Sequence, residues 1–582
     1  MFLRQVLNKQ TGRVYLQIAR GFRDSNGKPK SETIEKIGYL DVLQKKMEDP
    51  VSFYKEYAKK LEAEEKATQS FKLTINAEDR VERGVSNTRN YGYIALSKLY
   101  YELELDRFFN NARRHERFRF NSESIMRLLT YSRVLYPHSK KKTLEIKERF
   151  FENFDFTLDD VYDSLSHFSK CAAKTQAHIY KKIHEQYKID TSLIYYDVTN
   201  YYFETDTQDG YRMNGYAKDK HGKPIIQMGL AMDSRGIPMA YRTYPGNTND
   251  SETLIKALTD IKKEYNVGRA VVVADKGLNC GDNIAFNVAL GDGYVFSQSV
   301  RGGSRELKDY VLDESGYNDP TEEGFKSKSR VVPATAKITS GVTKTGRKSK
   351  KTVPIGDQKQ VVFYSPKYAV RAKMQREENI KKANQLIANP GKYNQSISYG
   401  AAAYIENFKV DSDTGEVLEG VKSKLKLNLA MIEEEAKYDG YYAIITSEVD
   451  SCDGAIIDTY RKLWMIEDTF KVTKSLIKTR PLFVYLPEHI DGHFLVCYIS
   501  LILIRLLELK LDGKFSAERI IETLRDVTCC HLEKNVFLFS YADEVTDAIN
   551  KAFGLDIGKK FMALQEIRSE IAMTKQNKSE PT

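Results

Sequence analysis

Three carboxylates lie at positions where they could meet and bind a metal ion. Asp197 lies inside "LIYYDVTNYYFET" (193–205), whose β-branched and aromatic residues predict a buried strand. Burying an unpaired carboxylate costs several kcal/mol, roughly, so Asp197 needs a partner. Asp275 ends "VVVAD", and strand ends of α/β sheets commonly carry functional groups. Glu467 lies on a predicted helix over 455–478, beside its apolar stripe and among lysines.

Each carboxylate also has a structural interpretation. Tyr195 and Thr199 share the strand face of Asp197, and a hydroxyl there could satisfy it. Asp275 could be a polar turn residue, and Glu467 could form an ordinary i,i+4 pair with Lys471 on a solvated face. Taken one at a time, these alternatives stay open.

Taken together, the three carboxylates indicate metal chemistry. Two aspartates on neighbouring strands and a glutamate on a helix that packs on the sheet can meet at one point, where their charges repel unless a cation is present. Mg²⁺ prefers oxygen ligands. A pair of such ions is the arrangement that catalyses in-line phosphoryl transfer.

The elements that must position these residues follow from the periodicity. Residues 191–300 predict the order β-β-β-α-β-α-β, with Asn249 as the N-cap of the first helix and Glu252 as its capping-box partner. The apolar β pattern returns at 441–447, before the helix that carries Glu467. On that helix the three–four spacing selects the core stripe Leu463, Ile466, Phe470, Thr473 and Ile477.

The rest of the chain divides into regions of different pattern. Within 301–440, residues 326–351 hold nine Lys or Arg and no Asp or Glu, which predicts either a DNA-tracking segment or a solvated loop. The apolar run Phe494–Ile504 is too short to span a bilayer and predicts a buried helix. We expect six regions: 1–80, strand-rich with a helix; 81–190, helical, for DNA binding or dimerisation; 191–300, first part of the catalytic core; 301–440, a basic β-rich insertion; 441–511, second part of the core; and 512–582, helical with a disordered tail.

Composition sets wide limits on function. The 582 residues are 41% hydrophobic and carry a net charge of +10, which permits a nucleic-acid partner without requiring one. The first residues hold no apolar core of signal-peptide length, and the six cysteines have no zinc spacing, so we expect reduced thiols in a cytoplasmic protein with no membrane partner.

The motifs resemble one family. The order of strands and helices with its Asp, Asp and Glu resembles the ribonuclease-H-like core of DDE transposases. Tyr460, Glu467 and Lys474 resemble the Tyr-x2-Arg-x3-Glu-x6-Lys signature of bacterial transposases of the "insertion sequence four" superfamily. The segments "YPGNTNDSETL" and "VVVADKGLN" resemble those around the second and third motifs of that family. The separation of 192 residues between Asp275 and Glu467 resembles the branch with a large β-rich insertion before the Glu helix. The signature arginine falls on Leu463, and Arg461 points elsewhere on a helix.

The resemblance implies a fold and an activity. The fold would be α/β: a ribonuclease-H-like mixed sheet with the β-rich insertion, strand-rich and helical regions before it, and a helical C-terminus. The enzyme would cut the ends of its insertion sequence and join them to target DNA. Asp197, Asp275 and Glu467 would hold two Mg²⁺, with Mn²⁺ as a substitute. The partners would be double-stranded DNA and a second copy in a dimer, near the bacterial nucleoid.

Positions near the triad have expected roles of their own. Lys474 and Tyr460 would position phosphates, as the resemblance implies, and helical spacing adds Lys471 and Lys478 to the same face. Trp464 could stack on a displaced base or pack in the core. Two other functions remain: a non-catalytic DNA-binding descendant, and another nuclease on the same core. A strand-transfer assay separates the three.

Overall fold

The computed structural model of this chain describes residues 1–582 except 10, 24–28, 69–79, 81–83, 85, 189, 216–221, 319, 322, 343–347, 391–392, 394–399, 410–422, 533–534 and 577–582. The chain forms two compact units, Met1–Val85 and Ser86–Thr582.

The first unit is a small sheet with helices. Its elements are β1 (Phe2–Leu7), β2 (Val14–Arg23), β3 (Pro29–Tyr39), α1 (Leu40–Leu43) and α2 (Pro50–Thr68). The strands pair antiparallel in the order β1-β2-β3. Gly12 adopts a φ of +69° in the turn between β1 and β2, a conformation that glycine reaches without strain. The buried side chains of Leu16, Ile18 and Ala58 give this unit an apolar centre.

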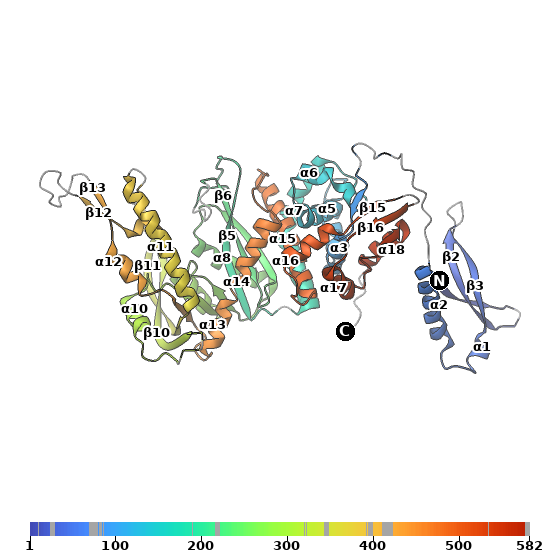
Figure 1. The fold of residues 1–582 in the computed structure, drawn as a ribbon, viewed down its shortest axis with the longest axis horizontal. Coiled ribbons are helices and arrows are strands. Elements are labelled where there is room, and N and C mark those ends of the chain that lie inside the picture. The colour runs from blue at the N-terminus through green and yellow to red at the C-terminus, as the bar shows by residue number, and fades with distance from the viewer. Residues whose placement is uncertain are drawn as a thin grey trace. The chain divides into compact units, whose positions relative to one another are not determined.

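The second unit is built on a mixed sheet whose core has the expected order of elements. These are β5 (Leu193–Tyr202), β6 (Ile225–Met232), β7 (Pro238–Pro245), α8 (Asp250–Tyr265), β8 (Val271–Ala274), α9 (Gly281–Ala289) and β9 (Gly293–Gln298). In space they lie β7-β6-β5-β8-β9, and Figure 1 shows β5 and β6 side by side within this unit. β5, β8 and β9 run parallel, while β6 and β7 are antiparallel hairpin strands. All four residues of β8 are buried, as expected for a strand covered on both faces.

The region expected to be a β-rich insertion contributes strands to this same sheet. Its elements are α10 (Arg305–Leu312), β10 (Lys326–Val342), β11 (Lys348–Tyr364), α11 (Pro366–Ala388), a 3₁₀ turn (Gly400–Tyr404), β12 (Ile405–Lys409), β13 (Ser423–Leu427) and α12 (Leu429–Ala436). β11 pairs with β14 (Tyr441–Thr446), and β14 pairs with β9. The described sheet therefore has eight strands, in the order β10-β11-β14-β9-β8-β5-β6-β7. Within this region, β12 and β13 form a separate described sheet of two strands.

Helices cover both faces of the sheet. Tyr196, Val272 and Ala274 pack with α8 and α9 on one face. Residues at the alternate positions, among them Tyr195 and Val273, pack on the other face with α13 (Asp453–Arg461), α14 (Trp464–Lys471) and α15 (Pro487–Lys510). α15 is the single described helix long and apolar enough to cross a membrane, but 89% of its most apolar window is buried inside the protein. It is a core helix, as its apolar run predicted.

The helical region and the C-terminal region pack around α15. The helices before the sheet are α3 (Tyr93–Glu102), α4 (Leu105–Ala112), α5 (Ser122–Leu135), α6 (Lys140–Glu145) and α7 (Leu158–Tyr187), with 3₁₀ turns at Arg113–His115 and Lys147–Arg149. The C-terminal elements are α16 (Ala517–Asp526), β15 (Thr528–His531), β16 (Val536–Phe539), α17 (Glu544–Phe553), β17 (Phe561–Ala563) and α18 (Leu564–Thr574). The C-terminal region has the expected helices, but it also contains short strands that were not predicted, because β15 pairs with β4 (Thr88–Asn90) in a small sheet.

Candidate active site

The sheet register brings Asp197 and Asp275 to neighbouring positions. β5 and β8 are parallel, with Tyr195 opposite Val273. If this register is continued two residues beyond the paired segment, Asp197 comes level with Asp275, which follows the last residue of β8. The Val198 amide donates to Asp197 Oδ1 at 2.7 Å, and the Gly277 amide donates to Asp275 Oδ1 at 2.8 Å. Both aspartates are partly exposed.

Strand alternation decides which face these carboxylates share. Side chains two residues apart on a strand point to the same face, so Asp197 and Asp275 lie on the face of Tyr195 and Val273. That face packs against Ile466 and Phe470 of α14. The aspartates therefore belong to the side of the sheet that carries Glu467, at the end of a short parallel strand.

Two hydrogen bonds fix the Glu467 segment over β5. The Tyr195 hydroxyl donates to the carbonyl oxygen of Thr459 at 3.0 Å. The hydroxyls of Tyr201 and Thr473 lie 2.8 Å apart. Asp197 lies between the two tyrosines on the strand, and Glu467 lies between the two threonines on the helical segment. Glu467 itself is exposed.

The charges of Asp275 and Glu467 both act on the phenol of Tyr460. Burial raises the pKa of its phenol to about 12, a hydrogen bond with Ser297 opposes this rise, and the negative charges of Asp275 and Glu467 add to it. The half-buried phenol thus lies within electrostatic reach of both carboxylates. Tyr442 on β14 also senses the charge of Glu467.

The three carboxylates share one region without forming a closed ligand set. Among the described residues, no group of three or more His, Cys, Asp or Glu is close enough to hold a metal ion. The donor chemistry nevertheless fits a hard divalent cation, since all three candidate ligands are carboxylates and two of them are register neighbours on parallel strands.

The helix that carries Glu467 is less regular than expected. The single helix predicted over 455–478 is interrupted after Arg461 and continues as α14, followed by a π-helical turn over Val472–Leu476. The core stripe is confirmed, because Leu463, Ile466, Phe470, Thr473 and Ile477 are all buried.

The π-helical end of this segment changes where its lysines lie relative to Glu467. Lys474 Nζ lies 5.9 Å from the ring centre of Tyr201, so this ammonium faces β5. Lys471 is exposed. Lys478 adopts a φ of +51° beyond the helix end. The helical spacing that grouped Lys478 with Glu467 therefore does not apply, because a π turn and a change of backbone direction separate them.

The position of the signature arginine is part of the core. Leu463 is 6% exposed and packs among the apolar residues beneath the sheet. Arg461 lies over the ring of Phe325 at 4.9 Å and pairs with Asp458, so it points toward the insertion strands. Trp464 is 62% exposed, which excludes the core-packing interpretation for this residue.

A pocket of arginines and tyrosines opens beside Asp275, and sequence reasoning missed it. It has a volume of about 500 Å³ and lies between the end of β9 and helix α11. Its cations are Lys276, Arg301, Arg371 and Arg376. Its tyrosines are Tyr368, Tyr404, Tyr438, Tyr441 and Tyr442. We call this the arginine–tyrosine pocket. The basic pattern of 366–388 was the available signal, but residues from several separate segments line the space.

The lysines of the basic stretch 326–351 differ in how far they are exposed. Lys328 Nζ lies 4.3 Å from the ring centres of both Tyr310 and Tyr317, and Lys326 packs against Tyr317 as well. These two lysines are buried or nearly so. The described lysines nearer the far end of the β10–β11 hairpin are more accessible: Lys337, Lys348, Lys350 and Lys351. Lys344 and Arg347 lie outside the described residues.

Comparison with known proteins gives two family matches. The family model described as "Transposase DDE domain" matches residues 188–503, more than half of the chain. The model described as "IS1634 family transposase, N-terminal domain" matches residues 3–75. No curated protein matches the chain.

Solved structures show weaker likeness. The structure titled "Cryo-EM structure of piggyBac transposase synaptic complex with hairpin DNA (SNHP)" is 10% identical, with a TM-score of 0.32 over 84% of this chain and 86% of that chain. The structure titled "Mos1 transposase paired-end complex with left transposon end" is 8% identical, with a TM-score of 0.14 over 44% of this chain and 70% of that chain.

Proposed function

This chain belongs to the transposases with a DDE domain and is therefore an enzyme that cuts and joins DNA strands, and we propose that Asp197, Asp275 and Glu467 are its catalytic carboxylates. The observation that supports this assignment is the parallel pairing of β5 with β8, whose register, continued two residues past Tyr195 and Val273, would bring the two aspartates level with each other. The bonds of Tyr195 and Tyr201 to the Glu467 segment support the third member.

The proposed carboxylates would hold two divalent cations, Mg²⁺ or Mn²⁺. Such ions would offset the repulsion among the carboxylates and stabilise the charge that develops on the attacking and leaving oxygens of a DNA phosphodiester. The protein's own part is to fix two of the ligands on adjacent strands and to let the third close over the substrate.

Tyr460 and Lys474 would position the DNA phosphate. The Tyr460 hydroxyl can donate a hydrogen bond to a phosphate oxygen at neutral pH. The Lys474 ammonium lies against the ring of Tyr201, four residues along β5 from Asp197. Lys471, which is exposed on the segment of Glu467, would add positive charge along the path of the backbone.

We assign the chain to the "insertion sequence four" superfamily, with a ribonuclease-H-like core. The support for the core is the strand arrangement β7-β6-β5-β8-β9 with the carboxylates on β5, after β8 and on the following helical segment. The support for the superfamily is the spacing of Tyr460, Glu467 and Lys474. Leu463 departs from the signature, and this buried apolar side chain makes no phosphate contact.

The DNA partner is expected to extend beyond the carboxylates. Lys276 and Arg371 of the arginine–tyrosine pocket and the accessible lysines of the β10–β11 hairpin would supply further cations, whereas Arg301 and Arg376 already pair with Asp439. We propose that the enzyme works as a homodimer on paired double-stranded ends, in the bacterial cytoplasm.

The test is a strand-transfer assay with the full chain. A labelled duplex that carries the end of the element is incubated with Mg²⁺ and a target plasmid. Asp197→Asn, Asp275→Asn and Glu467→Gln should each abolish cleavage and joining while end binding in a gel-shift assay stays within about two-fold. Asp458→Asn is the matched control, because this carboxylate is 72% exposed and its ion pair with Arg461 is long, at 3.7 Å.

The outcomes test each proposed catalytic residue and distinguish the candidate functions. A chelator should stop cleavage by the wild type. Near-normal cleavage by one of the three variants would remove that residue from the site. Cleavage without joined products would indicate a nuclease rather than a transposase, and end binding without cleavage under any metal would indicate a non-catalytic DNA-binding protein.

A further inference from the structure

The arginine–tyrosine pocket lies on the face of the sheet that carries the candidate carboxylates. Ser297 on β9 lines the pocket and forms a hydrogen bond with Tyr460, whose phenol senses the charge of Asp275. Tyr442 on β14 also lines the pocket. It lies two residues before Ile444, which packs in the core with α14, so the two side chains share that face. The pocket is therefore continuous with the candidate active site.

The order of the strands sets this pocket to one side of the two aspartates. Asp197 lies on β5 and Asp275 follows β8, and the next strands along the sheet are β9 and β14. The pocket lies where β9 ends and β14 begins, and Lys276, the residue after Asp275, is part of its lining. A DNA strand with one phosphate at the carboxylates can thus reach this pocket with a neighbouring phosphate.

Two of the four cations that line the pocket are already neutralised. Asp439 pairs with Arg301 at 2.7 Å and also pairs with Arg376. Lys276 and Arg371 form no ion pair within the part of the chain that the structure describes, and both side chains are exposed. These two cations are therefore able to bind an anion from outside the chain.

The carboxylates of this region do not cancel its positive charge. Glu435 lines the pocket and accepts a hydrogen bond from the Tyr404 hydroxyl at 2.5 Å. Glu435 and Asp439 together offset two of the four cations, so two positive charges remain in excess. An excess of this sign favours an anionic ligand.

Arg371 belongs to the wall of the pocket that is nearest to Glu467. The ring centres of Tyr368 and Tyr442 lie 4.9 Å apart in this wall. Burial and the neighbouring Tyr368 raise the pKa of the Tyr442 phenol, the charge of Arg371 opposes this rise, and that of Glu467 adds to it. Tyr442 thus lies within electrostatic reach of both charged groups. A guanidinium here offers a planar fork of donors that matches the oxygens of a phosphate.

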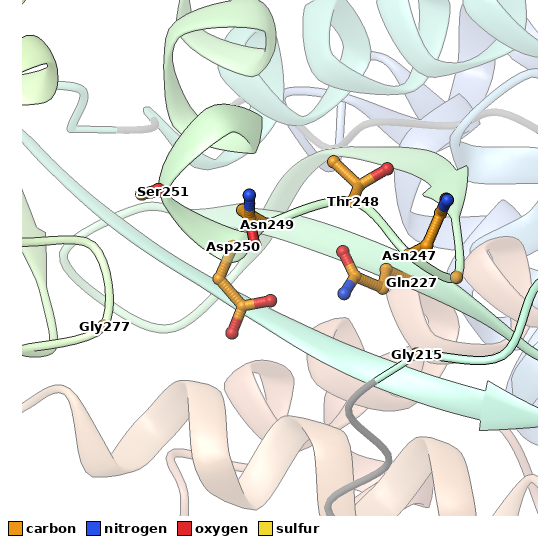
Figure 2. A pocket seen from close by; sticks show the side chains of 9 residues that line it. Gly215, Gln227, Asn247, Thr248, Asn249, Asp250, Ser251 and Gly277 are labelled. Carbon is orange, nitrogen blue, oxygen red and sulfur yellow. The ribbon is translucent and has the colours of Figure 1, made fainter. Parts of the chain in front are cut away.

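Another pocket, at the start of α8, has a lining without cations. Its volume is about 390 Å³, and α8 covers the other face of the sheet. Figure 2 shows the lining, in which none of the nine described residues is Lys, Arg or His. Asn249, the predicted N-cap of α8, lies here, but its side chain donates to Glu252 Oε1 at 3.4 Å, so the predicted capping box is absent from this described helix start. A phosphate is therefore expected to choose the arginine–tyrosine pocket.

We propose that Arg371 and Lys276 bind one phosphate of the strand that is cut, next to the phosphate at the carboxylates, and so fix this strand on the β14 side of the site. This inference rests on the proposed function and adds a binding subsite for its substrate. A guanidinium binds two phosphate oxygens at once, whereas an ammonium acts as a point charge. Arg371 therefore orients the strand, and Lys276 adds attraction.

The test measures DNA binding by the full chain in EDTA, so that no strand is cut. Duplexes that carry the end of the element have one phosphate replaced by a neutral methylphosphonate, placed in turn at each linkage around the cleavage site. Fluorescence anisotropy gives each affinity. Arg371→Gln should weaken binding of the unmodified duplex roughly ten-fold, the loss of one charge-assisted contact, and Lys276→Gln somewhat less. Arg371→Lys should recover part of the loss.

Arg305→Gln is the matched control. This arginine lies on α10, outside the pocket lining, its side chain is 95% exposed, and its contact with Asp309 is long, at 3.8 Å. Its removal takes away the same charge and should leave every affinity unchanged. The variants are expected to fold, because all three side chains are exposed.

The linkage at which the effects combine decides the proposal. A neutral linkage close to the cleavage site, on one side of it, should weaken binding by the wild type and add nothing to the loss in Arg371→Gln. The same linkage or its neighbour should behave in this way in Lys276→Gln. Additive losses at every linkage, non-additive linkages on both sides of the cleavage site, unchanged binding by both variants, or an equal loss in Arg305→Gln would overturn the proposal.

This experiment is independent of strand cleavage. It can fail while the carboxylate variants lose cleavage as proposed, which would leave the proposed function in place. Near-normal cleavage by the carboxylate variants would instead remove the proposed site, while the anisotropy measurement would still report whether Arg371 contacts a phosphate.

Discussion

A buried lysine behind the Glu467 segment should make the stability of this protein depend on pH. Lys140 is 5% exposed, and its Nζ lies 2.9 Å from His493 Nδ1. Arg133 is buried in the same cluster, and its guanidinium donates to the carbonyl oxygens of Lys478 and His138. Burial, followed by the positive charge of Arg133, lowers the pKa of Lys140 to about 7, while Cys497 opposes this shift weakly.

The sign and size of the effect follow from linkage. In the unfolded chain Lys140 titrates near 10.5. Between about pH 7 and pH 10.5 the unfolded chain binds more protons than the folded protein, so the free energy of unfolding rises with pH in this window. Below pH 7 both states are protonated and the penalty is constant. With these pKa values the gain between pH 7 and pH 10 is about 3 kcal/mol.

The assay is urea unfolding of the full chain at pH 7, 8, 9 and 10. Lys140→Met removes the titrating group and keeps an unbranched apolar stem, so its free energy of unfolding should lack this rise. Lys141→Met is the matched control, because Lys141 is the exposed neighbour on the same helix. The difference between wild type and Lys140→Met should shrink by about 3 kcal/mol from pH 7 to pH 10. Parallel profiles for the two proteins would refute the reasoning, since the lysine would then titrate alike in both states.

Three further predictions concern the site and its surroundings. Leu463→Arg should not restore the signature contact but should destabilise the protein by about 3–5 kcal/mol, as an unpaired buried charge does, and unfolding that matches Leu463→Met would contradict this. Tyr201→Phe should lower the cleavage rate about ten-fold with little loss of end binding, because it removes the bond to Thr473 that holds the helical segment on β5; an equal loss in single-turnover cleavage from Tyr202→Phe would show that the bond is not responsible. Glutamine substitutions at the accessible hairpin lysines should reduce the slope of log affinity against log salt concentration by about 0.9 per lost phosphate contact. These lysines are Lys337, Lys348, Lys350 and Lys351. An unchanged slope would show that the hairpin does not contact the DNA backbone.

The local patterns of the sequence determined the elements that carry the candidate site. The change of period after Asp190 predicted the β-β-β-α-β-α-β order, and the three–four spacing on the Glu467 helix identified its buried stripe. The apolar run of α15 predicted a core helix. These predictions succeed because a strand or helix with one buried face records that face in its own periodicity.

Tertiary structure alone decided how distant segments pair. β10 and β11 extend the central sheet rather than forming a separate insertion sheet, and β15 pairs with β4. Nothing within a strand specifies which distant edge it joins, because backbone hydrogen bonding is the same for every partner and the choice depends on packing. The same holds for side-chain environment: Lys328 resembles its exposed neighbours in the sequence, yet it lies between two tyrosines.

The candidate site shows the same division. Residue types and their spacing along the chain were enough to indicate Asp197, Asp275 and Glu467 as candidates. The arginine–tyrosine pocket beside Asp275 could not be predicted, because its lining comes from a strand end, helices and loops that are far apart in sequence. A carboxylate inside an apolar strand is a local anomaly that sequence reveals, whereas a hollow exists only once separate backbones have packed around it.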